Sequence, residues 1–160
     1  MNEEKVCCPK FDPIPWENKE IVWLDKMFVK GKTVSFFYMP LNMGAMMKKT
    51  WNKVEADGGV PESKDWIMLS KDISPWKCEH FLATSKEIVG LENVKISGTF
   101  FSKVFEGPFK EAKNWYQEMQ VVAKEKGVEA KDNIYFYYTT CPKCAKKWGK
   151  NYVVGLLKIK

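Results

Sequence analysis

Cys141 and Cys144 lie in the stretch TTCPKCAKKWGKNY, with the spacing of a metal clip or a redox pair. Two such thiolates can converge on one ion from a tight turn, or one thiol can resolve a disulfide formed by the other. A tetrahedral zinc site needs two more ligands, and Cys7 and Cys8 are the candidates for them. Three alternatives stay open: a zinc site, a redox pair and an unligated turn. Cys78 is expected to be a packing residue.

Two other residues could carry acid–base chemistry. Glu106 ends an expected strand just before a helix, where it could favour the helix N-terminus electrostatically or serve as a general base at a cleft mouth. His80, the one histidine, lies in the expected strand EHFLATS and is a candidate ligand contact or a packing residue. No G-x-S-x-G nucleophile elbow is present, so nothing in the sequence points to a serine hydrolase triad.

Aromatic residues form the third group of candidates. Taken one by one they are typical core residues, but together they exceed what a two-helix core of this size requires. Aromatic walls bind flat or cationic ligands by stacking and cation–π attraction, at about 0.5–2 kcal/mol per contact. The candidate ligand-binding aromatics are Tyr38, Trp76, Trp115, Tyr138 and Tyr152.

Hydrophobic periodicity predicts the elements that position these residues. Alternation predicts strands, and apolar residues spaced three and four apart predict helices that stop at the glycines following them. In the first half we expect strands at 20–25, 30–40, 66–70 and 79–84, with a helix at about 42–57. In the second half we expect strands at 93–105, 134–140 and 152–159, with a helix at about 108–126.

Each half is therefore expected to read strand, helix, strand, strand. We predict an α+β fold in which two pseudo-repeats, about 20–90 and 91–160, form one curved antiparallel sheet with both helices on one face. Residues 1–19, rich in proline, are expected to be an extended N-terminal arm. Strands that are aromatic on both faces, such as IYFYYTT, favour a ligand cleft or a subunit contact on the other face.

Composition narrows the classes of function. All the basic residues among the 26 Lys+Arg are lysine, and they are interspersed with acids. Lysine lacks the bidentate fork with which arginine grips phosphates and reads guanine, so the net charge of +6 indicates a solvated surface and no direct nucleic-acid binding. No apolar run is long enough to span a bilayer, and the charged start MNEEKVCCPK is unlike a signal peptide. We expect a cytoplasmic protein, a monomer or homodimer.

The stretch VFEGPFKEAKNWYQEM resembles the strand–Gly-Pro-aromatic–helix signature of the GyrI-like small-molecule-binding domain, where His-x-Gly-Pro-Tyr is usual. CCPKFDP, FFYMPLNMG and YTTCPKCAKKWGKNYVV resemble a stand-alone branch of that family whose members are commonly labelled hydrolases. The resemblance implies a concave sheet face that binds an aromatic or cationic small molecule. It also implies a glutamate in the central cleft. The closing strand 152–160 contains no acid, so Glu106, at the signature's histidine position, is the expected acid.

The expected function is thus binding of a small hydrophobic, aromatic or cationic molecule in an aromatic cleft. One alternative is a small hydrolase acting on a reactive molecule in the same cleft. A second alternative is an interaction domain stapled by zinc.

Overall fold

The structure, a computed structural model, describes residues 12–36, 39–40, 43–61, 67–74, 76–139 and 151–160. Its elements follow one another in this order: η1 (Ile14–Trp16), β1 (Lys19–Phe36), β2 (Met39–Pro40), α1 (Met43–Ala56), β3 (Met68–Ser74), β4 (Lys77–Ala83), β5 (Glu92–Glu106), η3 (Phe109–Glu111), α2 (Ala112–Glu125), β6 (Ile134–Tyr138) and β7 (Tyr152–Lys158). Apart from the short β2, each half runs strand, helix, strand, strand.

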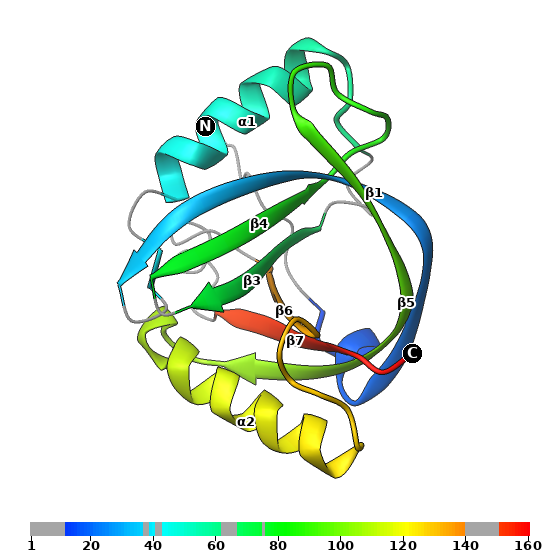
Figure 1. Cartoon of the computed structure of the whole chain (residues 1–160), viewed down its shortest axis with the longest axis vertical. Helices are drawn as coiled ribbons and strands as arrows, with labels where there is room; N and C mark the ends of the chain where they lie inside the picture. Colours follow the sequence, from blue (N-terminus) through cyan, green and yellow to red (C-terminus); the bar gives the residue numbers. More distant parts are fainter. Residues whose placement is uncertain (1–11, 37–38, 41–42, 62–66, 75, 140–150) are drawn as a thin grey trace, which may run out of the picture.

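Six antiparallel strands form a sheet that closes on itself (Figure 1). Their order is β1-β4-β3-β6-β7-β5, and β5 pairs back with β1. The expected α+β fold with a curved antiparallel sheet is confirmed. The closure itself was not predicted: a sheet with a helix-covered face and an open face was expected, whereas the closed sheet has an inside and an outside.

The two longest strands make the closure possible. β1 pairs with β5 through residues 19–30 and with β4 through residues 28–34, so a single strand serves two neighbours. A register shift between Trp23 and Lys26 interrupts the β1–β5 ladder, and Asp25 there has φ 48°. Bulges of this kind bend a strand and increase its twist. The strands expected separately at 20–25 and 30–40 are therefore largely one bent strand, β1.

Both helices pack on the outer face of the barrel, on opposite sides of it in Figure 1. On one side Val54 of α1 packs with Val29 and Leu82. On the other side Trp115 and Met119 of α2 are buried against the sheet, and the Trp115 ring stacks on Phe105 at 5.9 Å between centroids. The helices were expected at about 42–57 and 108–126. They form close to those bounds, with a 3-10 turn, η3, preceding α2.

A separate hydrophobic cluster lies on the inner face of the sheet. All six strands of the closed sheet contribute to it, and neither α-helix does, which places it inside the barrel. Its buried members are Phe28, Ile67, Leu69, Phe81, Ala83, Phe100, Val154 and Leu156. Because strand residues alternate between the two faces, each strand supplies one row to the interior and another to the helices. This is why IYFYY is apolar on both sides.

Candidate functional site

Five aromatic rings inside the barrel form a closed cycle of contacts, here called the aromatic cycle. Its members are Trp23, Phe28, Phe81, Tyr135 and Phe100, in order around the cycle. The successive centroid distances are 6.0, 6.4, 5.9, 6.0 and 4.9 Å, the last closing the cycle between Phe100 and Trp23. The rings meet edge-on or tilted, the geometry that aromatic quadrupoles favour. They come from β1, β4, β5 and β6, so the closure of the sheet is what brings them together.

Two lysine ammonium groups stand over rings of the aromatic cycle. Lys26 Nζ lies 5.9 Å from the centroids of both Trp23 and Phe28. Lys71 Nζ lies 5.6 Å from the centroid of Tyr135. Cation–π attraction of this kind helps to hold a charged group against an apolar surface. Lysine ammonium groups and aromatic rings thus lie side by side in the interior.

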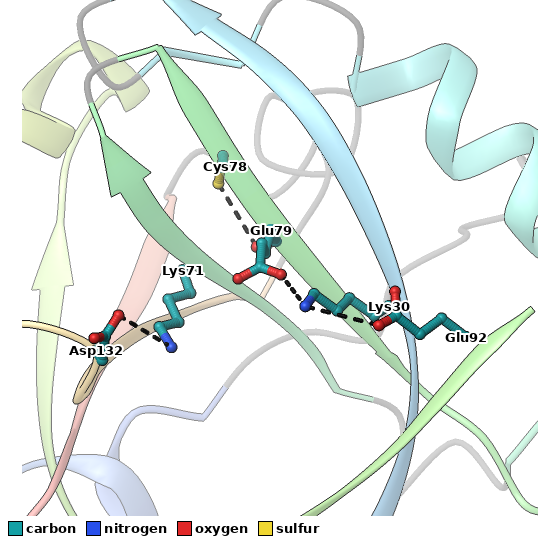
Figure 2. A network of polar contacts seen from close by, with 6 residues as sticks. All are labelled: Lys30, Lys71, Cys78, Glu79, Glu92 and Asp132. Atoms are coloured by element: carbon teal, nitrogen blue, oxygen red, sulfur yellow. Dashed lines mark hydrogen bonds and ion pairs between the residues drawn. The ribbon is translucent and has the colours of Figure 1, made fainter.

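The carboxylate of Glu79 lies on the inner face with these groups. Glu79 alternates along β4 with the outward-facing Cys78 and His80 and lies on the same side as Phe81. Its carboxylate contacts the ammonium of Lys30, which also faces Glu92 at 3.9 Å (Figure 2). The side chains of Lys30 and Glu79 are 20% and 14% exposed. A carboxylate that is largely removed from water and engaged by a cation can bind ligands or accept a proton.

The interior groups keep some contact with solvent. Trp23, Lys26 and Tyr135 are half-buried, as are Trp16 and Tyr137, whose rings meet edge-on at 5.3 Å. Burial, and secondarily the negative charge of Asp132, raise the pKa of Tyr135, so its phenol stays protonated and can donate a hydrogen bond at neutral pH. Asp132 also faces Lys71 at 3.6 Å, as Figure 2 shows.

His80 lies on the opposite, outer face of β4. It is fully buried, and its Nδ1 and Nε2 lie 2.7 Å from the hydroxyls of Ser70 and Thr33. Burial lowers the pKa of His80 to about 4, so the imidazole is neutral at physiological pH. With both ring nitrogens satisfied and no exposed surface, this arrangement is that of a packing histidine.

The site residues predicted from the sequence lie in different parts of the structure. Glu106 is exposed at the end of β5, where it pairs with Tyr152 of β7. Trp115 of α2 is buried between the helix and the outer face of the sheet. Trp76 is 50% exposed between β3 and β4, and Tyr138 pairs with Val153 at the end of β6. Glu106, Trp115 and Trp76 are not members of the interior cluster.

The remaining candidates, Tyr38 and the four cysteines at 7, 8, 141 and 144, lie outside the described residues. Cys78 is buried, as expected of a packing residue, and its thiol donates to the carbonyl oxygen of Glu79 at 3.7 Å. Within the described ranges, no three His, Cys, Asp or Glu side chains gather where they could hold a metal ion. In the same ranges no helix has the length and apolar character needed to cross a membrane.

Sequence reasoning missed Glu79, Lys30, Lys71 and Lys26. A signal was present: lysines and a glutamate recur at alternate positions in strands whose neighbouring residues are apolar, as in KCEHFLA and MFVKGK. Such residues must either face solvent or face a polar interior, and the pattern alone does not choose between the two.

The chain belongs to the bacterial hydrolase family, whose model matches residues 1–159. No curated protein matches it. Membership of this family and the aromatic cluster inside the barrel are both compatible with a small-molecule binding or hydrolase role.

Proposed function

We propose that the protein is a hydrolase for a small aromatic or hydrophobic molecule that binds inside the barrel. The observation that carries the proposal is the Glu79–Lys30 contact on the same inner face as the aromatic cycle. The match to the bacterial hydrolase family supports hydrolysis as the type of reaction. Glu79 replaces Glu106 as the acid in this proposal, because Glu106 is exposed at a strand end.

In the proposed reaction the aromatic cycle positions the substrate beside Glu79. The carboxylate takes a proton from water as the water oxygen attacks the acyl carbon of an ester or lactone. The bond to the leaving oxygen breaks, and that oxygen takes the proton from the Glu79 carboxyl group, which restores the carboxylate. Lys30 keeps the Glu79 carboxylate in place, and the Tyr135 phenol can donate a hydrogen bond to oxygen on the substrate.

Binding without turnover is the second candidate function. Lys30 already engages the Glu79 carboxylate, so that contact has to loosen before the carboxylate accepts a proton. The GyrI-like resemblance of the segment from Val104 to Met119 also favours a binding domain, and we propose that the two halves of the chain are a duplication of one strand–helix–strand–strand unit. A protein of this kind would sense or sequester its ligand.

The test is turnover of a panel of p-nitrophenyl esters and aryl lactones by the purified protein. Glu79→Gln removes the proton acceptor and should lower kcat/KM by roughly 10²–10⁴-fold, the usual contribution of a general base. Glu106→Gln is the matched control, since it makes the same change at an exposed acid, and it should stay within about threefold of the wild type. Thermal unfolding of both variants checks that each is folded.

Three outcomes separate the candidates. Loss of activity in the Glu79 variant alone supports the hydrolase. Loss in the Glu106 variant alone returns the acid to the position expected from the sequence and contradicts the role given to Glu79. Saturable quenching of tryptophan fluorescence without turnover of any ester or lactone supports binding alone.

Two further proposals concern the whole chain. We propose that Cys7, Cys8, Cys141 and Cys144 are the four ligands of a zinc ion. The two thiolates at Cys-x-x-Cys spacing need two more ligands to complete a tetrahedral site. Metal analysis of protein purified without chelator tests it. We also propose that the protein acts in the cytoplasm as a monomer or homodimer.

A further inference from the structure

The lysines of the inner face differ in how far a carboxylate compensates their charge. Lys30 is matched by Glu79, which its ammonium contacts. Lys71 faces Asp132 at 3.6 Å, but the Asp132 side chain is 65% exposed, and pairs with so exposed a partner are weak. Among the described residues no carboxylate pairs with Lys26. Of these three lysines, Lys26 is the one that no described carboxylate pairs with.

Lys26 is the least compensated of these cations. It is half-buried beside the bulge of β1, and its ammonium stands equally far from the rings of Trp23 and Phe28. The neighbouring Asp25 carboxylate instead accepts a hydrogen bond from Ser97 Oγ, at 3.2 Å. Removing an ammonium from water without an anion is unfavourable, and ring faces compensate for part of that loss. An anion placed beside Lys26 would compensate for more of it.

A cation would find the opposite situation. Glu79 is the carboxylate of the inner face that is mostly removed from solvent, and Lys30 already occupies it. A cationic ligand would have to displace Lys30 from Glu79, or stand over rings beside Lys26 and Lys71. Both arrangements place like charges close together.

We propose that the molecule bound inside the barrel is a flat aromatic carboxylate, with its ring against the aromatic cycle and its carboxylate paired with Lys26. This inference rests on the proposed function and narrows it: the aromatic substrate carries a free carboxylate in addition to the ester or lactone bond that is hydrolysed. Lys26 is thereby a specificity-determining residue. The aromatic ring of the ligand makes contacts that any flat molecule can make. Its negative charge is what distinguishes it from neutral and cationic molecules of the same shape.

Three probes of the same shape test the proposal: naphthalene-2-carboxylate, 2-naphthylmethanol and 2-naphthylmethylammonium, titrated calorimetrically at pH 7 and low ionic strength. The carboxylate should bind at least about tenfold more tightly than the alcohol, and the ammonium most weakly. Lys26→Met keeps the apolar stem and removes the charge. It should weaken carboxylate binding about tenfold and leave alcohol binding within about twofold.

Controls make the outcome specific to Lys26. Lys95→Met removes an exposed lysine of β5 that follows the inward-facing Val94, and it should leave all three affinities unchanged. Lys26→Arg should restore the preference for the carboxylate, and thermal unfolding confirms that each variant is folded.

The failures are distinguishable. If the alcohol binds as tightly as the carboxylate, the anionic ligand is wrong while the binding site inside the barrel stands. If Lys26→Met weakens all three probes equally, Lys26 has a structural role and the inference is likewise overturned. If none of the three binds, both the inference and the proposed site inside the barrel fall.

Discussion

At the scale of single residues, His80 illustrates how this fold removes a titratable group from water. The imidazole lies between the hydroxyls of Ser70 and Thr33, so one ring nitrogen can donate and the other accept. A protonated imidazole would have to be charged in a fully buried place, which is why its pKa falls to about 4.

This shift predicts a pH-dependent stability. The unfolded chain holds the His80 proton up to a pKa of 6.5, whereas the folded protein releases it above about 4, so acid favours unfolding between these values. The free energy of unfolding should fall by about 2 kcal/mol from pH 7 to pH 5 on account of this group. Urea unfolding at each pH measures it. His80→Gln should remove this part of the pH dependence, and equal slopes for the two proteins would contradict it.

His80 was among the candidates predicted from the sequence, but its neighbour Glu79 was not. Adjacent strand residues lie on opposite faces, so placing His80 on the outer face puts Glu79 inside the barrel. The sequence could not make this choice, because both faces of the sheet are packed and alternation between apolar and polar residues is weak. Glu106 was chosen because it occupies the histidine position of the GyrI-like signature. A position in a motif does not determine the direction in which the side chain points.

At the scale of elements, the contact between α2 and the barrel depends on Gly155. This glycine of β7 is buried, and a Cβ on it would lie 2.6 Å from Met119 Sδ and 3.0 Å from Phe105 Cε2. The helix can therefore approach the strand because a side chain is missing there. Close packing of this kind makes even one methyl group costly.

Gly155→Ala should destabilise the protein by about 1–3 kcal/mol through overpacking. The same change made in a Met119→Ala background should cost less, because the thioether that the methyl group meets is gone. A double-mutant cycle measured by chemical unfolding gives this coupling. Identical costs in the two backgrounds would show that Met119 yields easily and that Gly155 is not what sets the approach of α2.

Helices and strands were predictable to different extents. The apolar faces of 42–57 and 108–126, with glycines beyond their ends, locate α1 and α2 closely, because helix signals are local. Of the long strands, β5 was expected at 93–105 and forms at Glu92–Glu106, whereas the bulge beside Asp25 made β1 look like two strands. A bulge is determined by pairing with a distant strand, which periodicity along one segment does not reveal.

At the scale of the whole molecule, the closure of β5 onto β1 creates the inner face on which the account depends. An open sheet would have left Trp23, Phe28 and Phe100 on an exposed surface. Instead they line the inside of a barrel together with Tyr135 and Phe81. Closure joins residues 19–30 to 92–102, a long-range pairing, and so it could not be read from local sequence signals.

The central claim, that the barrel interior is the binding site, is tested most directly by NMR of the tryptophan indole N–H groups. The signals are assigned by single Trp→Phe variants, and the protein is titrated with naphthalene-2-carboxylate. Trp23 lies in the aromatic cycle, whereas Trp115 packs outside the barrel under α2. The account predicts a saturable shift of the Trp23 signal and none at Trp115. A shift at Trp115 with the Trp23 signal unmoved would contradict it.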